Sequence, residues 1–212
     1  MKRFLLLGLT LLLLLTSCSS VRRLERDAEG YGYTDQKSGI YYAEMDACFE
    51  PARAGDVWGE YKNDKGDVTR TFRSIPDLDP ALFLTDEYLN VYYAGDVAID
   101  ASAWQIAAVL VCEEDVVSVE NFRFSAGSDD ATVAAIRALW FESAGDAALP
   151  LGKADYARRI KLTTTAYPNL FYCFSFLAYD SGEAYFYDAN SRRTVVVPEE
   201  LAAQMRPVTA EE

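Results

Sequence analysis

Leu170-Phe171-Tyr172-Cys173-Phe174-Ser175-Phe176-Leu177-Ala178-Tyr179 is the stretch of sequence that most constrains the fold. Apolar side chains stand at both odd and even positions, which predicts a β-strand that is buried on both faces. Turn-forming residues precede it at 167–169 and follow it at 180–182. We therefore expect a central strand in an antiparallel meander, whose other strands we place at 160–165, 184–187 and 194–197.

Further strand signals lie before this meander. Residues 40–45 and 88–93 are rich in the aromatic and branched side chains that favour strands. Residues 56–62 and 68–73 flank the turn-forming pentapeptide Asn63-Asp64-Lys65-Gly66-Asp67 and predict a β-hairpin. Asp79 followed by proline is typical of a helix start, so we expect a short helix over 79–84.

Two longer segments predict the principal helices. Residues 100–111 are apolar nearly all round and rich in alanine, with Asp100 or Ser102 as a cap. A buried strand is the alternative there, because periodicity does not separate short apolar runs. Residues 128–145 begin with Ser128-Asp129-Asp130, which suits a helix N-terminus. We also expect a strand over 116–124 and a last short helix over 198–205.

These elements predict an α+β fold, in which a mainly antiparallel sheet has two principal helices packed against it. The helix over 128–145 carries an apolar stripe at helical spacing that would face the core. We expect the core to include Trp104, Ile106, Leu110, Val133, Ile136, Trp140, Phe174 and Phe176.

The N-terminal segment carries the clearest functional signal. Lys2 and Arg3 precede an apolar run from Phe4 to Leu15, which is shorter than the about 20 residues that cross a bilayer as a helix. A cleavable secretory signal fits this pattern. Leu15-Thr16-Ser17-Cys18 also resembles the lipobox of bacterial lipoproteins. The resemblance implies that residues 1–17 are removed and that Cys18 carries a lipid anchor; an ordinary signal peptide with an incidental cysteine is the alternative.

The same resemblance implies a place in the bacterial cell envelope. Ser19 follows the cysteine, rather than the aspartate that retains some lipoproteins at the inner membrane, so we expect the outer membrane, facing the periplasm or the surface. Residues 18–39 are charged and poor in apolar side chains, which predicts a lipidated flexible tether. Residues 40–206 would then form a single globular domain, followed by an acidic tail over 207–212.

The charge of the chain bears on its partners. Once Lys2 and Arg3 are removed with the signal, 18 cations face 33 acids, a net charge of −15. Nucleic acids and anionic headgroups are bound chiefly by Lys and Arg. We therefore expect no nucleic-acid partner, and a membrane contact through the lipid on Cys18.

Composition also limits the chemistry. The chain contains no histidine, which excludes Ser-His-Asp and Cys-His catalysis and His-ligated zinc. Cys48, Cys112 and Cys173 are scattered among apolar neighbours, so we expect free structural thiols, with Cys48 the most accessible; a disulfide between two of them is the alternative. The loop at 63–67 lacks the ligands of an EF-hand. We therefore expect no catalytic, cofactor-binding or metal-binding residue.

Tyrosine is abundant, with 14 copies. Exposed tyrosines would bind sugars or proteins, whereas strand tyrosines would pack in the core. Two groups stand out in the sequence: Tyr31, Tyr33, Tyr41 and Tyr42, and later Tyr179, Tyr185 and Tyr187.

The sequence as a whole favours a non-catalytic, membrane-anchored lipoprotein that binds another envelope protein or a cell-wall polymer, with no cofactor. The alternative is a carboxylate-dependent envelope enzyme such as a glycan hydrolase. A pocket with convergent acids of raised pKa would favour that alternative.

Overall fold

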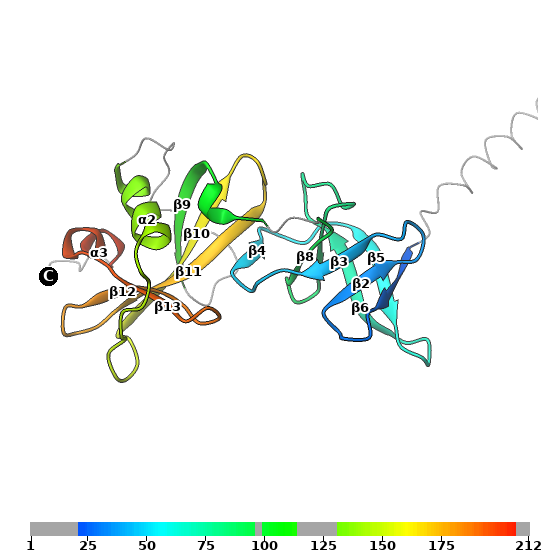
Figure 1. The fold of residues 1–212 in the computed structure, drawn as a ribbon, viewed down its shortest axis with the longest axis horizontal. Helices are drawn as coiled ribbons and strands as arrows, with labels where there is room; N and C mark the ends of the chain where they lie inside the picture. The colour runs from blue at the N-terminus through cyan, green and yellow to red at the C-terminus, as the bar shows by residue number, and fades with distance from the viewer. Residues whose placement is uncertain (1–20, 96–98, 114–130, 207–212) are drawn as a thin grey trace, which may run out of the picture.

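The fold is built mainly from strands, arranged as a closed barrel and a second sheet (Figure 1). The structure is a computed structural model and describes residues 21–95, 99–113 and 131–206. In these ranges there are two short α-helices, α2 (Ala131–Glu142) and α3 (Glu199–Met205). The expected α+β fold was therefore wrong: strands dominate, and seven of them close into a barrel.

The barrel closes in the order β1-β2-β3-β8-β7-β6-β5. Its pairs are antiparallel except for β1 and β5, which run parallel with Arg22 opposite Gly59. A side chain at Gly59 would collide with Leu24, so glycine lets these two strands close the barrel. The strands are β1 (Arg22–Arg26), β2 (Gly32–Asp35), β3 (Tyr41–Glu44), β5 (Val57–Lys62), β6 (Val68–Ser74), β7 (Phe83–Asp86) and β8 (Val91–Tyr93).

The expected flexible tether over residues 18–39 was wrong from Arg22 on, because β1 and β2 are two strands of the barrel. Leu24 is buried in the barrel, and Arg22 Nη1 lies 2.6 Å from Oδ2 of the buried Asp35. A barrel strand needs apolar side chains only at the positions that point inward. The charged segment therefore forms a strand with a single inward-pointing leucine. The interior side chains are Leu24, Tyr33, Tyr42, Phe72, Leu84 and Tyr92.

The second sheet has the order β13-β12-β11-β10-β9, with β4 paired to the start of β11. The predicted meander is confirmed, because β10 to β13 pair with their sequence neighbours in antiparallel fashion. β4 lies beside residues 170–172 of β11, and β12 lies beside 175–178 along the same edge. The bounds are β4 (Phe49–Pro51), β9 (Ile106–Glu113), β10 (Tyr156–Thr164), β11 (Leu170–Ala178), β12 (Ala184–Asp188) and β13 (Arg193–Val196).

The helix expected over residues 100–111 was wrong. Asp100 caps only a single 3-10 turn, η1 (Ala101–Ala103), and β9 follows as an edge strand of the sheet. Val109 and Val111 face one apolar cluster, and Leu110 and Cys112 face another. Because both faces of this strand are covered, its sequence is apolar all round, and the alternative of a buried strand applies.

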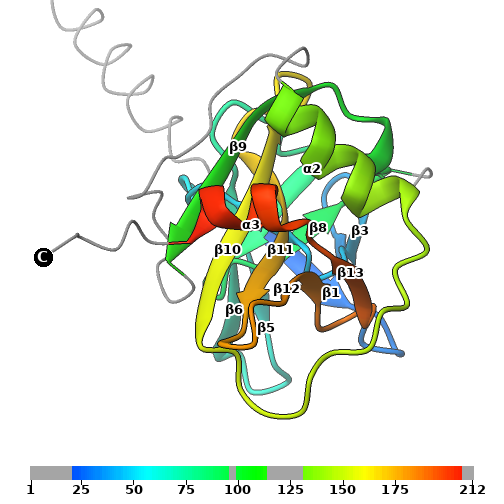
Figure 2. The same cartoon turned by 90° about the vertical axis from the view of Figure 1, so that its left-hand side faces the viewer.

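The two C-terminal helices agree with the sequence and cover one side of the sheet (Figure 2). Trp140 of α2 stacks on Phe174 of β11, with ring centroids 4.3 Å apart and an angle of 8° between the planes. Arg193 Nε donates to the carbonyl oxygen of Trp140 at 2.8 Å, which satisfies the C-terminal end of α2. All eight expected core residues are buried.

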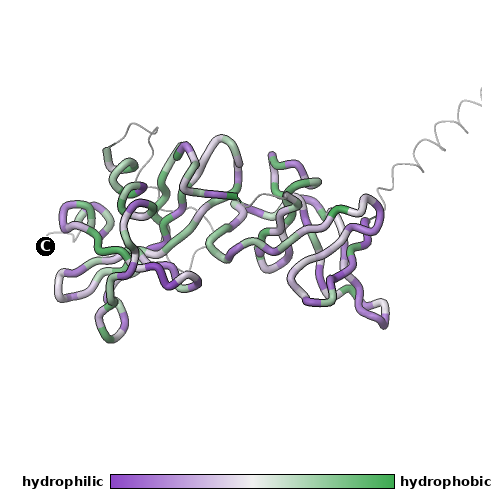
Figure 3. The backbone as a smooth tube through the Cα atoms, in the orientation of Figure 1, coloured by the Kyte–Doolittle hydropathy of each residue, from purple (hydrophilic) through white to green (hydrophobic). Residues whose placement is uncertain are grey.

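Two further predictions, a hairpin and a short helix, concern local turns. The hairpin is confirmed: Asn63 Oδ1 accepts from the backbone N–H groups of Lys65 and Asp67, each at 3.0 Å, in the hydrophilic turn drawn purple at the end of β5 in Figure 3. The short helix over 79–84 was wrong. Asp79 caps a single turn through Ala81 N–H at 2.8 Å, and β7 begins at Phe83. The expected strand over 116–124, the helix start at 128–130, Cys18 and the tail at 207–212 lie outside the described residues.

The barrel and the second sheet share a hydrophobic core. Ile75, Phe83 and Val91 of the barrel side belong to the same cluster as the inner face of the sheet. Asn169, at the start of β11, donates from Nδ2 to the carbonyl oxygen of Pro76 at 2.9 Å. The junction between the two parts is therefore a packed interface, and a cleft lies beside it.

Candidate functional site

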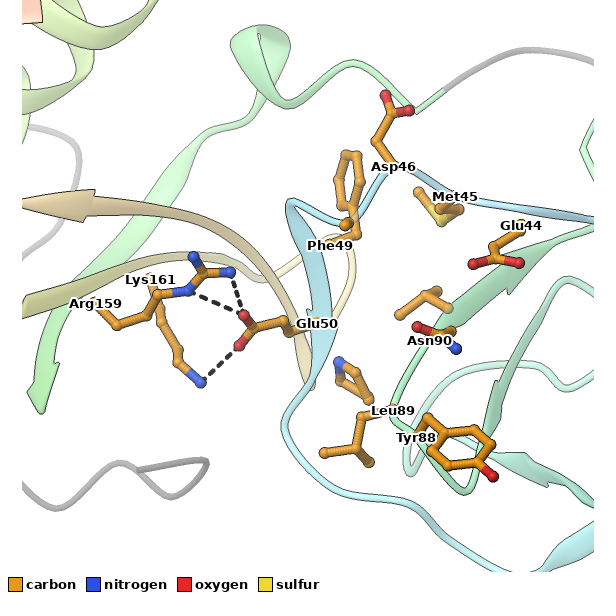
Figure 4. A pocket seen from close by; sticks show the side chains of 13 residues that line it. Glu44, Met45, Asp46, Phe49, Glu50, Tyr88, Leu89, Asn90, Arg159 and Lys161 are labelled. Carbon is orange, nitrogen blue, oxygen red and sulfur yellow. Dashed lines mark hydrogen bonds and ion pairs between the residues drawn. The ribbon is translucent and has the colours of Figure 1, made fainter. Parts of the chain in front are cut away.

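A cleft of about 340 Å³ lies between β4 of the sheet and the segments that carry β3 and β8 of the barrel (Figure 4). One wall comes from the sheet, where Glu50, Arg159 and Lys161 meet. The other wall comes from the barrel, with Glu44 at the end of β3 and Tyr88 and Asn90 just before β8. The cleft therefore depends on both parts of the fold.

The sheet wall is held by a three-membered charge cluster. Glu50 Oε1 accepts from Arg159 Nε at 3.0 Å and also from Arg159 Nη2, while Lys161 Nζ lies 2.9 Å from Glu50 Oε2. Lys161 is 1% exposed, and the Glu50 carboxylate compensates the charge of its ammonium group. Both cations project from one face of β10, because they stand two residues apart on a strand.

Burial and charge act in opposite directions on Glu50. Burial raises the pKa of its carboxyl group, but the nearby charges and hydrogen bonds of Arg159 and Lys161 outweigh burial, so the pKa lies below its ordinary value. The carboxylate is thus ionised at neutral pH, and its two oxygens contact Arg159 and Lys161. This arrangement suits a structural ion cluster, and it differs from the raised pKa that a general acid requires.

The barrel wall carries acidic side chains that remain exposed to solvent. Glu44 and Asp46 are exposed carboxylates at the rim of the cleft. Glu44 Oε2 accepts a long hydrogen bond of 3.5 Å from the hydroxyl of Tyr92. The single proton of that hydroxyl is shared with the buried Asp86, whose Oδ2 lies 3.2 Å from the hydroxyl oxygen and 3.0 Å from Arg70 Nη1. The buried network thus stabilises the barrel beneath the rim and leaves the two rim carboxylates open to solvent.

The tyrosines divide between core and surface. Tyr33 and Tyr42 fill the barrel, and Tyr179 and Tyr185 are buried at the far end of the sheet. The exposed tyrosines of the described residues are Tyr31 at 72%, Tyr41 at 44% and Tyr88 at 69%. Tyr88 lines the cleft, and Tyr31 lies beside it, because its carbonyl oxygen accepts from the N–H of Glu44 at 3.1 Å.

The three cysteines of the described residues are free thiols. All three are buried: Cys48, which we expected to be the most accessible, is 7% exposed against 0% for the other two, and it is packed in the main core beside the junction. Burial raises the pKa of Cys48 to about 12, and burial likewise raises the pKa values of Cys112 and Cys173. Nucleophilic chemistry would need a thiolate, which these environments disfavour.

Sequence reasoning missed the charge cluster. Its members come from strands more than 100 residues apart, since Glu50 and Arg159 are 109 positions apart in the chain. One local signal pointed to it: Lys161 stands between Ile160 and Leu162 in a strand whose neighbours are apolar. A lysine in such a run, where lysine is rarely fully buried unless paired, indicates a buried partner of opposite charge.

The comparisons with known proteins add no relative. No family model matches the chain, and neither the curated proteins nor the solved structures contain a match. Over residues 21–95, 99–113 and 131–206, no group of three or more Cys, Asp or Glu side chains could hold a metal ion. In the same ranges, neither helix has the length and apolar character needed to cross a membrane.

Proposed function

We propose that this chain is a non-catalytic lipoprotein of the bacterial cell envelope, anchored through Cys18, that binds another envelope protein or a cell-wall polymer. The observation that carries the proposal is the sequence before the barrel: two cations, a short apolar run and Leu15-Thr16-Ser17-Cys18. A single acyl chain binds a membrane only marginally, whereas the diacylglyceryl group of a lipoprotein cysteine supplies the two chains that stable anchoring requires.

The cleft between the barrel and the sheet is the surface we assign to the partner. It combines rim carboxylates of Glu44 and Asp46 with the exposed ring of Tyr88, and Tyr31 extends the same surface. Tyrosine is enriched where proteins bind other molecules, because its ring buries apolar area and its hydroxyl remains hydrogen-bonded. Amide, hydroxyl and ammonium groups of a peptide or a cell-wall polymer would complement these acceptors.

The alternative function, a carboxylate-dependent enzyme such as a glycan hydrolase, receives no support from the cleft. A glycan hydrolase needs one carboxyl group of raised pKa that donates a proton. In the cleft, the carboxyl group held between two cations, Glu50, has a lowered pKa. The binding function is therefore the one that the geometry favours.

Labelling of the intact chain in bacteria tests the anchor. Cells fed a clickable fatty acid should incorporate the label into the wild-type protein, and the Cys18→Ser variant should remain unlabelled. Equal labelling of both forms would exclude a lipid on this cysteine. The whole-cell membrane fraction should also retain the wild type and release the variant.

Crosslinking in the same cells tests the cleft. We expect Tyr88→Ala combined with Asp46→Asn to reduce the yield of each specific crosslinked species at least fivefold. The matched control is Asp64→Asn, which removes an exposed acid that lies in the turn between β5 and β6 and does not line the cleft. Equal loss in the control, or no loss in the cleft variant, would exclude the cleft as the binding surface.

A further inference from the structure

The connection between the anchor and the barrel is short. The expected tether of 22 residues is replaced by a barrel strand that begins at Arg22, four residues after Cys18. A fully extended chain advances at most about 3.6 Å per residue, so the Cα atom of Arg22 lies within about 14 Å of the Cα atom of the anchored cysteine. The start of β1 is fixed to the barrel by the ion pair of Arg22 with the buried Asp35.

The strand register shows at which end of the barrel Arg22 lies. Arg22 pairs with Gly59, next to Val57 at the start of β5. Across the next pairs, Val57 lies opposite Arg73, and Ser74 lies opposite Leu84. We call the end of the barrel that contains Val21, Arg22, Val57, Trp58 and Leu82 the anchor-side mouth.

This mouth carries unusual side chains for a molecule with so acidic a surface. Val21, Val57 and Leu82 are three of the six exposed large aliphatic residues among those described. Trp58 lies beneath the Arg22 guanidinium, whose Cζ is 4.4 Å from the ring centroid. Tryptophan and arginine suit the interface between lipid and water, where one part of a side chain is apolar and another is polar.

The opposite mouth has a different character. It contains the hydrophilic turn at 63–67, at the end of the β5–β6 hairpin (Figures 1 and 3). The strand directions also place there Tyr31, before β2, Glu44, at the end of β3, and Tyr88, before β8. The antiparallel register places these residues at the far ends of the same strands, since β5 runs from Val57 to Lys62. The five steps from Val57 to Lys62, at about 3.3 Å each, span roughly 17 Å along the strand from one mouth to the other.

We propose that the anchor-side mouth of the barrel rests on the lipid headgroups and that the cleft mouth faces away from the membrane. This inference rests on the proposed lipid at Cys18. Four residues cannot lift the barrel clear of the bilayer, and Val21, Val57 and Leu82 place apolar surface where the headgroups begin. The orientation leaves Glu44 and Tyr88 open to a partner.

Headgroup quenching on the processed lipoprotein tests this orientation. Val57→Cys and Val68→Cys provide a matched pair, because these valines are 42% and 48% exposed and occupy opposite ends of one hairpin. Each variant is labelled with a small fluorophore through maleimide, which spares the buried native thiols. The labelled proteins are reconstituted in phosphatidylcholine vesicles that contain a phosphatidylcholine with a nitroxide on its headgroup.

We expect quenching at position 57 to exceed quenching at position 68 at least threefold. Equal quenching, or stronger quenching at 68, would overturn the orientation while the mass of the N-terminal peptide still shows the lipid. A peptide mass without lipid on Cys18 would overturn both the anchor and the orientation. Inserting 20 Gly and Ser residues after Ser20 should bring the ratio towards one; an unchanged ratio would show that the short connection does not set the orientation.

Discussion

The ammonium nitrogen of Lys161 lies 2.9 Å from Oε2 of Glu50, and the lysine is almost completely excluded from solvent. The contact joins β10 to β4, two strands that do not pair with each other in the sheet. β4 follows the last residues of the barrel strand β3 in the chain. The ion pair thus secures the segment that crosses from the barrel to the sheet and forms one wall of the cleft.

Removing the charge of Glu50 should destabilise the fold. In the Glu50→Gln variant, the buried Lys161 loses the charge of the Glu50 carboxylate, and breaking a buried pair from one side costs several kcal/mol. Because the Glu50 side chain is partly open to water, we expect a loss of about 2–3 kcal/mol in the free energy of unfolding. Urea denaturation of the detergent-solubilised protein measures it.

Glu142→Gln is the control for this substitution. Glu142 also pairs with an arginine, Arg137, at 3.0 Å, but both side chains are exposed. Exposed pairs contribute about 0–1 kcal/mol, so this variant should unfold close to the wild type. Equal losses in the two variants would contradict the structural role of the Glu50 cluster.

The contribution of Glu50 should also depend on pH. Its folded-state pKa is lowered, since the attraction of Arg159 and Lys161 outweighs the opposing effect of burial. The unfolded chain then takes up the proton first as the pH falls, so the stabilisation is complete above the ordinary carboxyl value of about 4.3. It is lost as the pH drops from there through the folded-state pKa.

Urea titrations at several pH values between 7 and 3 measure this effect. The difference in unfolding free energy between the wild type and Glu50→Gln should stay constant from pH 7 to about 5 and shrink below that. Other acids titrate in both proteins, so the difference isolates Glu50. A difference that grows on acidification would contradict the lowered pKa.

Trp140 should be among the most sensitive positions of the core. It is buried, it stacks on Phe174, and its Nε1 donates to the hydroxyl of Tyr172 at 3.1 Å. Trp140→Ala should cost about 3–5 kcal/mol of unfolding free energy. The exposed Tyr88 offers a control, because Tyr88→Ala should change stability by no more than about 0.5 kcal/mol. A loss below about 1 kcal/mol at Trp140 would place α2 with the wrong face inward.

The sequence predicts the second sheet far better than the barrel, for physical reasons. The meander around residues 170–179 is local: each strand pairs with its neighbour in sequence, and apolar runs alternate with turns. Barrel closure depends on the pairing of β1 with β5 and of β3 with β8, which lie far apart in sequence. β1 contributes only Leu24 to the interior, so hydrophobic patterning does not distinguish it from a solvated tether.

The cleft was unpredictable for a related reason. Its walls come from β4, β8 and β10, and the acids at its rim resemble any of the 33 acids of the chain. Lys161 was the informative residue, because a lysine within an apolar strand requires a partner. The sequence does not say which of the many carboxylates supplies it.

The thiols supply a last prediction, which also bears on the anchor. Cys48, Cys112 and Cys173 are free and buried, and burial raises the pKa of Cys48 to about 12. Cys112 and Cys173 lie on β9 and β11, on either side of β10. Two strand spacings separate their backbones by about 9–10 Å, which is beyond the roughly 7 Å that a disulfide spans.

The native mature protein should therefore react negligibly with Ellman's reagent at pH 8, and the urea-unfolded protein should release three equivalents. The sulfur of Cys18 is excluded from this count when it carries the proposed lipid. Four equivalents would show an unmodified Cys18, and one equivalent would show that two of the three core thiols form a disulfide. Rapid reaction of the folded protein would contradict the burial of Cys48, because a thiol packed at the barrel junction reacts only when that junction opens.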